Sequence, residues 1–198
     1  MSNSDGGAMC AGCSSNEPTR RRVLTGASLV SLGLASRVAI CSASAEPADE
    51  RPKEGDQLVA IDASAPMPLA PGDINGPLLA WPMEPATSLV RSDSRLNKIV
   101  LVRLDPASLT GVTRERATEG VVAYSAICPH AGCEVNGWVA EQGLLECPCH
   151  NSRYDPREAA MIVDGPTTRP LAALPLKIEE GKLVVAKPFI GRLGIAPA

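Results

Sequence analysis

The sequence Cys128-Pro129-His130-Ala131-Gly132-Cys133, the first box, is followed thirteen residues later by Cys147-Pro148-Cys149-His150-Asn151-Ser152, the second box. The two boxes hold both histidines of the 198-residue chain and four of its seven cysteines. Thiolate and imidazole groups at such short spacings are ligands that proteins use for transition metals. The boxes therefore predict a metal centre that two loops build together.

The pattern C-x-H-x-G-C followed by C-P-C-H resembles the two cluster-binding loops of Rieske proteins. In that family a 2Fe-2S centre has two cysteine thiolates on one iron and two histidine imidazoles on the other. The resemblance implies one 2Fe-2S cluster per chain, bound by Cys128 and His130 of the first box and by Cys147 and His150 of the second. Because neutral imidazoles lower the negative charge of the site, it also implies a high reduction potential.

The resemblance further implies a disulfide between Cys133 and Cys149, which would tie the two boxes together. A structural zinc site is the alternative, because two pairs of cysteine and histidine ligands also bind zinc. Zinc accounts for neither Cys133 nor Cys149, nor for the residues that follow His150. We therefore favour the iron-sulfur cluster.

The residues after His150 sharpen the resemblance. High-potential members of the family continue Gly-Ser-x-Tyr, and this chain has Asn151, Ser152 and Tyr154 in the matching positions. The resemblance implies that the Ser152 hydroxyl bonds a bridging sulfide and that the Tyr154 hydroxyl bonds a cysteine sulfur, and both bonds raise the potential. Asparagine adopts positive φ more readily than most residues, so we expect the turn at Asn151 to be kept. An ordinary serine and a half-buried tyrosine are the alternative.

A third stretch, Gly165-Pro166-Thr167-Thr168-Arg169-Pro170-Leu171, resembles the proline loop of the family. The resemblance implies that Gly165 and Pro166 cover the cluster from a third side. A Gly-Pro turn between two strands is an equally good interpretation from sequence alone.

The amino-terminal sequence predicts the compartment. Thr19-Arg20-Arg21-Arg22-Val23-Leu24 resembles the twin-arginine export motif, and residues 23–36 form an uncharged stretch too short to span a membrane. Ala43-Ser44-Ala45 then offers a cleavage site between small residues. We expect residues 1–45 to be a twin-arginine signal peptide that delivers the protein to the periplasm. That route carries folded proteins, and the compartment preserves disulfides.

Two alternatives concern the same leader. A retained signal anchor would hold the protein on the membrane, facing the periplasm. Lipidation at Cys41 is a weaker alternative, because Ile40 is too bulky for the usual lipidation motif. Cys10 and Cys13 form a C-x-x-C pair with no second pair at a suitable spacing, and we interpret them as incidental.

The remaining chain, residues 46–198, is long enough for one domain. Aromatic residues make up 3% of the whole sequence, so the core must be built from Val, Leu, Ile and Ala. Without the leader, 15 basic and 20 acidic residues remain, which gives a net charge of about -5. This charge argues against nucleic acid as a partner.

Strand signals dominate this domain, as short β-branched or alternating runs bounded by Gly, Pro or Asn. The runs are 57–62, 98–104, 121–125, 144–146, 161–163, 176–179 and 183–186. Glu180-Gly181 predicts a hairpin turn. Residues 63–97, with six prolines, predict no regular structure, and residues 106–119 predict a short helix with Arg114, Glu115 and Arg116 on its solvated face.

These signals and the resemblance predict an all-β fold. We expect an antiparallel Rieske-type β sandwich at 46–198, with a small inserted cluster-binding subdomain at about 126–171. Residues 63–97 and 106–119 show no catalytic chemistry, and they either pad the sheet or form a docking surface.

The resemblance implies one-electron transfer in the periplasm, by a soluble carrier or by the small subunit of an oxidoreductase complex, similar in layout to the Rieske subunit of arsenite oxidase. The partner would be a cytochrome c or a larger oxidoreductase subunit. The alternative is the membrane-anchored Rieske subunit of a cytochrome bc-type complex, which would oxidise quinol at His150. A ring-hydroxylating oxygenase is excluded, because its mononuclear iron needs two further histidines. No catalytic residue is expected.

Overall fold

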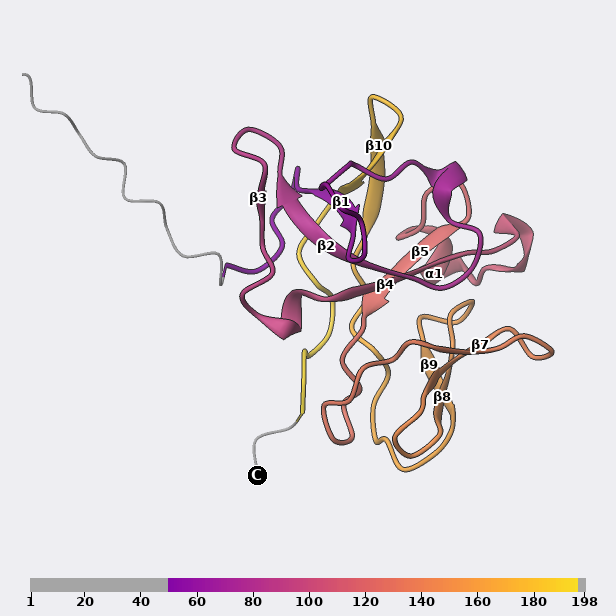
Figure 1. Ribbon diagram of the computed structural model, residues 1–198. Coiled ribbons are helices and arrows are strands. Elements are labelled where there is room, and N and C mark those ends of the chain that lie inside the picture. The colour runs from indigo at the N-terminus through magenta and orange to yellow at the C-terminus, as the bar shows by residue number, and fades with distance from the viewer. Residues whose placement is uncertain (1–49, 196–198) are drawn as a thin grey trace, which may run out of the picture. The chain divides into compact units, whose positions relative to one another are not determined.

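The computed structural model describes residues 50–195 (Figure 1). The predicted signal peptide, its cleavage site after Ala45, and the cysteines Cys10, Cys13 and Cys41 lie outside the described residues. Among residues 50–195, no helix is both long and apolar enough to cross a membrane.

The larger of two antiparallel sheets is formed by strands from both ends of the described chain (Figure 1). Its strands are β1 (Gln57–Ala60), β2 (Leu78–Glu84), β3 (Leu89–Val90), β4 (Ile99–Arg103), β5 (Val121–Ser125), β10 (Leu176–Glu179) and β11 (Lys182–Val185). The order is β10-β11-β1-β2-β4-β5, and β3 pairs with β2. The predicted two-residue turn between β10 and β11 is present, with Glu180 and Gly181 both at positive φ.

The outer edge of β5 is paired rather than open. The amide of Ser125 donates to the carbonyl of Ala172 over 2.8 Å, and the amide of Leu174 donates to the carbonyl of Ala123 over 2.9 Å. Because residues 172–174 lead directly into β10, the strand at the opposite edge, the larger sheet closes on itself. Pairing along this edge gives partners to backbone groups of β5 that an edge strand would otherwise leave open.

The smaller sheet is inserted between β5 and β10. Its strands β6 (Gly137–Val139), β7 (Leu144–Cys147), β8 (Ser152–Asp155) and β9 (Met161–Asp164) pair in chain order. The second box forms the connection between β7 and β8. The predicted all-β antiparallel fold is confirmed, and the four inserted strands occupy the stretch where the sequence predicted a subdomain.

The prediction for residues 63–97 was wrong, because β2 lies there in the middle of the larger sheet. Its interior Pro82 had suggested irregular structure. The carbonyl of Pro82 accepts a 2.9 Å hydrogen bond from the amide of Arg91, so its missing N–H would point to that same side. The pairing of Pro82 with Leu58 in β1 therefore loses no hydrogen bond, and the proline is tolerated.

Within residues 50–195, helical structure is limited to short segments: the 3-10 turns η1 (Pro71–Asp73), η2 (Arg95–Asn97) and η3 (Pro106–Ser108) and the single α-helical turn α1 (Gly111–Arg114). The helix predicted within 106–119 is therefore present only as η3 and α1. Arg114 and Glu115 are exposed as predicted, whereas Arg116 is half-buried.

Alternation along β4 and β5 builds a core on each face of the sheet. Val100, Val122 and Tyr124 face a cluster that includes Tyr154 and one cysteine from each box, Cys128 and Cys147. The intervening residues of the same strands face a second cluster: Ile99, Leu101, Val121 and Ala123. Strands β4 and β5 are thus buried on both faces, and one face supports the metal centre.

Candidate metal centre

The first box is a tight loop that follows β5. The amide of Cys128 donates to the carbonyl of Cys133 over 2.8 Å, and the amide of Gly132 donates back to the carbonyl of Cys128 over 2.9 Å. Gly132 adopts φ +73°, which lets the chain turn sharply. The thiol of Cys128 is buried at 1% exposure, whereas His130 at the loop tip is exposed.

The second box is the tip of a hairpin. Cys147 in β7 and Ser152 in β8 are register partners, and residues 148–151 connect them. Asn151 adopts φ +55°, which confirms the expectation that asparagine keeps this turn. Cys147 is buried at 1% exposure and His150 is exposed, so the second box repeats the arrangement of the first.

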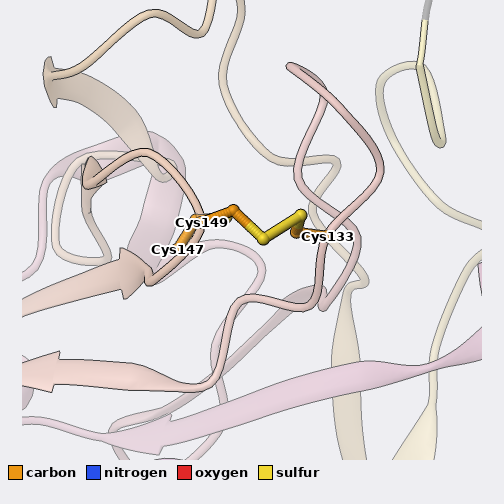
Figure 2. Close-up of side chains that lie close together, drawn as sticks. All are labelled: Cys133, Cys147 and Cys149. Carbon is orange, nitrogen blue, oxygen red and sulfur yellow. A yellow bond between two sulfur atoms is a disulfide. The ribbon is translucent and has the colours of Figure 1, made fainter.

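A disulfide joins the two boxes (Figure 2). It links Cys133 to Cys149, whose Cα atoms lie 6.5 Å apart, and this is the pairing that the resemblance implied. The sulfur of Cys147 lies within 4.8 Å of both disulfide sulfurs. Because disulfide sulfurs are not thiolates, Cys147 is the member of this group that can bind a metal.

The two imidazoles meet at the surface. The ring centres of His130 and His150 lie 4.6 Å apart, with the ring planes at 87°. The two free thiols of the described residues, Cys128 and Cys147, are both buried beneath the boxes. The four predicted ligands thus fall into a buried sulfur pair and an exposed nitrogen pair.

The buried pair is electrostatically unfavourable for an isolated thiolate. Burial raises the pKa of the Cys147 thiol, and the neighbouring Cys128 raises it further. Tyr154 is fully buried, and its hydroxyl lies 3.2 Å from the Cys128 sulfur. Burial, with a contribution from Cys128, also raises the pKa of Tyr154, so this hydroxyl keeps its proton. A bound cation would favour the thiolate form of Cys147 at this buried position.

Ser152 supplies a direct test of whether this site suits an inorganic cluster. Its side chain is fully buried, and its Oγ has no hydrogen-bond partner among the described residues. Buried hydroxyls without a partner are rare and indicate a missing ligand, ion or water. A sulfide is an acceptor of the required kind, and a zinc ion is not. The donor set and this unpaired hydroxyl together fit a 2Fe-2S cluster.

The third predicted loop lies against the second box. Gly165 adopts φ +94°, and a Cβ placed on it would lie 2.5 Å from the Cα of Ser152. Only glycine can approach this closely. Pro166 beside it is exposed, and Thr167 is buried. The alternative interpretation, a Gly-Pro turn between two strands, is also compatible with this placement, because Gly165 directly follows β9.

Sequence reasoning missed two contacts that join the residues just before β4 to the first box and to the residue that follows it. Arg95 in η2 donates to the carbonyl of Gly132, and Lys98 forms an ion pair with Glu134. The partners in each pair are more than 35 residues apart. No local pattern could have indicated either contact.

Comparison with protein families gives one match: residues 90–175 match the model of the Rieske [2Fe-2S] domain. The matched range contains both boxes and the third loop, together with β4 and β5 that carry them.

Similar proteins include Rieske subunits of respiratory complexes. The chain is 40% identical over 97 residues to a Haloferax mediterranei protein whose name describes a respiratory nitrate reductase Rieske subunit, and the match covers 48% of this chain and 43% of that one. It is 37% identical over 106 residues to the Rieske iron-sulfur subunit of the cytochrome bc1 complex of Corynebacterium glutamicum, covering 50% and 26%. The matching Corynebacterium efficiens subunit is 32% identical over 149 residues, covering 71% and 36%. The chain thus spans less than half the length of each.

Two solved structures are similar at lower identity. The soluble domain of Rieske protein II from Sulfolobus acidocaldarius is 20% identical with a TM-score of 0.39, covering 54% of this chain and 70% of that one. The ferredoxin of carbazole 1,9a-dioxygenase from Nocardioides aromaticivorans is 18% identical with a TM-score of 0.40, covering 70% and 99%.

Proposed function

We propose that the chain binds one 2Fe-2S cluster in the stretch that matches the Rieske [2Fe-2S] domain, and that it transfers single electrons in the periplasm, as a soluble carrier or as the small subunit of an oxidoreductase complex. The similarity to respiratory Rieske subunits supports electron transfer. The periplasmic location rests on the leader sequence at residues 1–45.

Cys128 and Cys147 hold one iron in this proposal, and His130 and His150 hold the other. The cluster supplies a centre that accepts and returns one electron without bond rearrangement in the protein. The protein keeps water from the thiolates by burying both, and it presents both imidazoles at the surface. An electron entering or leaving then passes through the histidine side, where a partner can make contact.

The observation that carries this function is the separation of buried sulfur donors from exposed nitrogen donors, across two boxes joined by one disulfide. A purely structural metal site has no need to expose half of its ligands. Coulometric titration of the purified protein should take up one electron per chain. A protein that accepts no electron reversibly would end the proposal.

The ligand assignment has a matched control in the second box. His150→Ala should abolish cluster assembly, because both histidines of the chain are already in use. Asn151→Gly, at the next position, which is also exposed, should retain the cluster, because glycine accepts the φ of +55° found there. Visible absorption of the two purified variants distinguishes them, and a fully loaded His150→Ala protein would refute the assignment.

Membership of a cytochrome bc-type complex is the second candidate, because several similar proteins are named as subunits of such complexes. That role requires quinol as the electron donor and a membrane anchor. Proteins that co-purify from periplasmic and membrane fractions decide between the two roles. A soluble product beginning at Glu46 supports the carrier, whereas a membrane-bound product that retains residues 20–45 supports the complex.

The export route has its own test. Changing Arg20 and Arg21 together to Lys should trap the precursor in the cytoplasm, whereas Arg37→Lys, outside the motif, should leave export unchanged. Immunoblots of cell fractions measure both. Normal export of the double variant would refute the twin-arginine route while leaving the cluster assignment intact.

A further inference from the structure

The C-terminal segment 187–195, yellow in Figure 1, runs from β11 towards the first box. Ile190 pairs with Ala173 through two backbone hydrogen bonds of 2.9 and 2.7 Å. Further along, the Arg169 guanidinium of the third loop donates to the carbonyls of Arg192 and Gly194. The end of the described chain is thereby held beside the metal centre.

A groove of about 350 Å³ lies between this segment and the first box. Leu96, Ile127, Ala131 and Ile195 give it an apolar lining, and Ile195 remains 55% exposed. Because Ala131 directly follows His130, the groove is next to one of the two surface imidazoles. An apolar surface beside the point of electron exit is a suitable contact area for a partner.

Arginines border this groove. Arg95 lines it, and Arg51 donates over 2.9 Å to the hydroxyl of Ser94, which also lines it. Arg169 lies at its other side, through its hydrogen bond to the lining residue Gly194. All three guanidinium groups bond neutral oxygen atoms, and within residues 50–195 none of the three forms an ion pair.

Three other basic residues of the described chain are neutralised by ion pairs. Lys98 pairs with Glu134, Arg153 with Glu146, and Arg157 with Asp155. No acidic residue of the described chain lines the groove. The nearest in sequence are Asp93, which is exposed next to Ser94, and the already paired Glu134. The groove border is therefore a positive region on a chain whose net charge after the leader is about -5.

We propose that this groove is the docking site for a redox protein whose cofactor edge is apolar and bordered by carboxylates. The proposal rests on the electron-transfer function and names the chemistry of its partner. The apolar lining excludes water at the contact, and the unpaired arginines steer and orient carboxylates around it. The net negative charge of the rest of the chain disfavours docking of the same partner elsewhere.

Two c-type cytochromes of similar size and opposite net charge test the sign of the docking surface. Stopped-flow oxidation of the reduced protein should be faster with the acidic cytochrome at low ionic strength, and this rate should fall as salt is added. The net charge of the chain alone predicts the reverse order. A faster reaction with the basic cytochrome that slows with added salt would overturn the proposal.

Charge-removing variants locate the docking surface. Arg51→Gln and Arg95→Gln together should slow the acidic cytochrome roughly fivefold to tenfold at low ionic strength. Arg103→Gln is the control and removes the charge of one arginine elsewhere. Arg103 pairs with Val121 at the start of β5, whereas the first box follows the other end of β5. Equal slowing by Arg103→Gln would show that the effect is general and would refute the groove.

A redox-inert anion separates docking from electron transfer. Hexacyanocobaltate(III) should shift the methyl NMR signals of Leu96, Ile127 and Ile195, and Arg95→Gln should weaken this binding severalfold. If neither cytochrome is reduced while the anion still binds there, the electron-transfer function fails and the anionic docking site stands. The docking proposal is overturned if the anion shifts none of these methyl signals. It is also overturned if the anion binds the wild-type protein and Arg95→Gln equally well.

Discussion

The hydroxyl of Tyr154 lies 3.2 Å from the sulfur of Cys128, 26 residues earlier in the chain. Strand β8 brings the ring into the core beneath the first box, where it is fully buried. Because burial raises the pKa of this hydroxyl, Tyr154 keeps its proton and can donate it to a Cys128 thiolate. A donor aimed at a ligand sulfur stabilises the more negative, reduced state of a cluster.

Tyr154→Phe should therefore lower the reduction potential by several tens of millivolts while the cluster is retained. A hydrogen bond to a charged group contributes about 1.5 to 3 kcal/mol, and about 59 mV corresponds to 1.4 kcal/mol for one electron. Tyr124→Phe is the control, because the Tyr124 hydroxyl bonds the carbonyl of Pro156 instead of a sulfur. Protein-film voltammetry measures both, and equal potentials in the two variants would contradict the role of Tyr154.

Ser152→Ala should stabilise the cluster-free protein and lower the reduction potential of the loaded protein. In the cluster-free protein the buried Ser152 hydroxyl lacks a partner, so its removal should raise the free energy of unfolding by about 1 kcal/mol. In the loaded protein the same change should lower the potential. Ser125→Ala should instead destabilise the cluster-free protein, because the Ser125 hydroxyl accepts a bond from the Ile127 amide. Urea titration and voltammetry test this, and a destabilised cluster-free Ser152→Ala protein would show that the hydroxyl has a protein partner.

Gly165→Ala should destabilise the protein by about 2 to 4 kcal/mol, because the new methyl group would lie 2.5 Å from the Cα of Ser152 and φ is +94°. Gly181→Ala is matched in backbone strain, with φ +75°, but meets no atom within 4 Å. It should cost only about 1 kcal/mol. Thermal unfolding of both variants measures the difference, and similar losses would mean that the third loop is not packed tightly on the second box.

Replacing Cys133 and Cys149 together with Ser should lower the free energy of unfolding by about 3 kcal/mol. This value follows from the length of the loop that the disulfide closes, since the two residues are 16 positions apart. Iron should also be released faster, because the boxes would lose their covalent link. Urea unfolding of the cluster-free double variant measures the first effect. The control is the reduced wild-type protein, which should match the variant. Unchanged stability in both would show that other contacts hold the boxes.

The sequence predicted the parts of the fold with strong local signals. Strands β5 and β10 lie within the predicted residues, and Asn151 has the positive φ expected of a glycine substitute. Strand β8 was missed although its signal was present: Ser152 and Tyr154 are buried and alternate with Arg153 and Asp155. The same residues carry the Ser-x-Tyr motif that continues the second box.

Other features depend on distant partners. Strand β2 was missed because Pro82 is acceptable only where the neighbouring strand needs no N–H from it. The contact between Arg95 and Gly132 spans 37 positions, and the groove beside it exists only once the C-terminal segment is in place. The two boxes predicted the disulfide and the residues that the structure gathers at the candidate centre, whereas its supports and surroundings required the three-dimensional structure.

Metal and sulfide analysis of the purified protein, combined with electron paramagnetic resonance of its reduced form, tests the central claim most directly. The donor set of Cys128, Cys147, His130 and His150 predicts two irons and two acid-labile sulfides per chain. The reduced protein should give a rhombic signal with the low average g-value of mixed cysteine and histidine ligation. Stoichiometric zinc without labile sulfide would contradict the account.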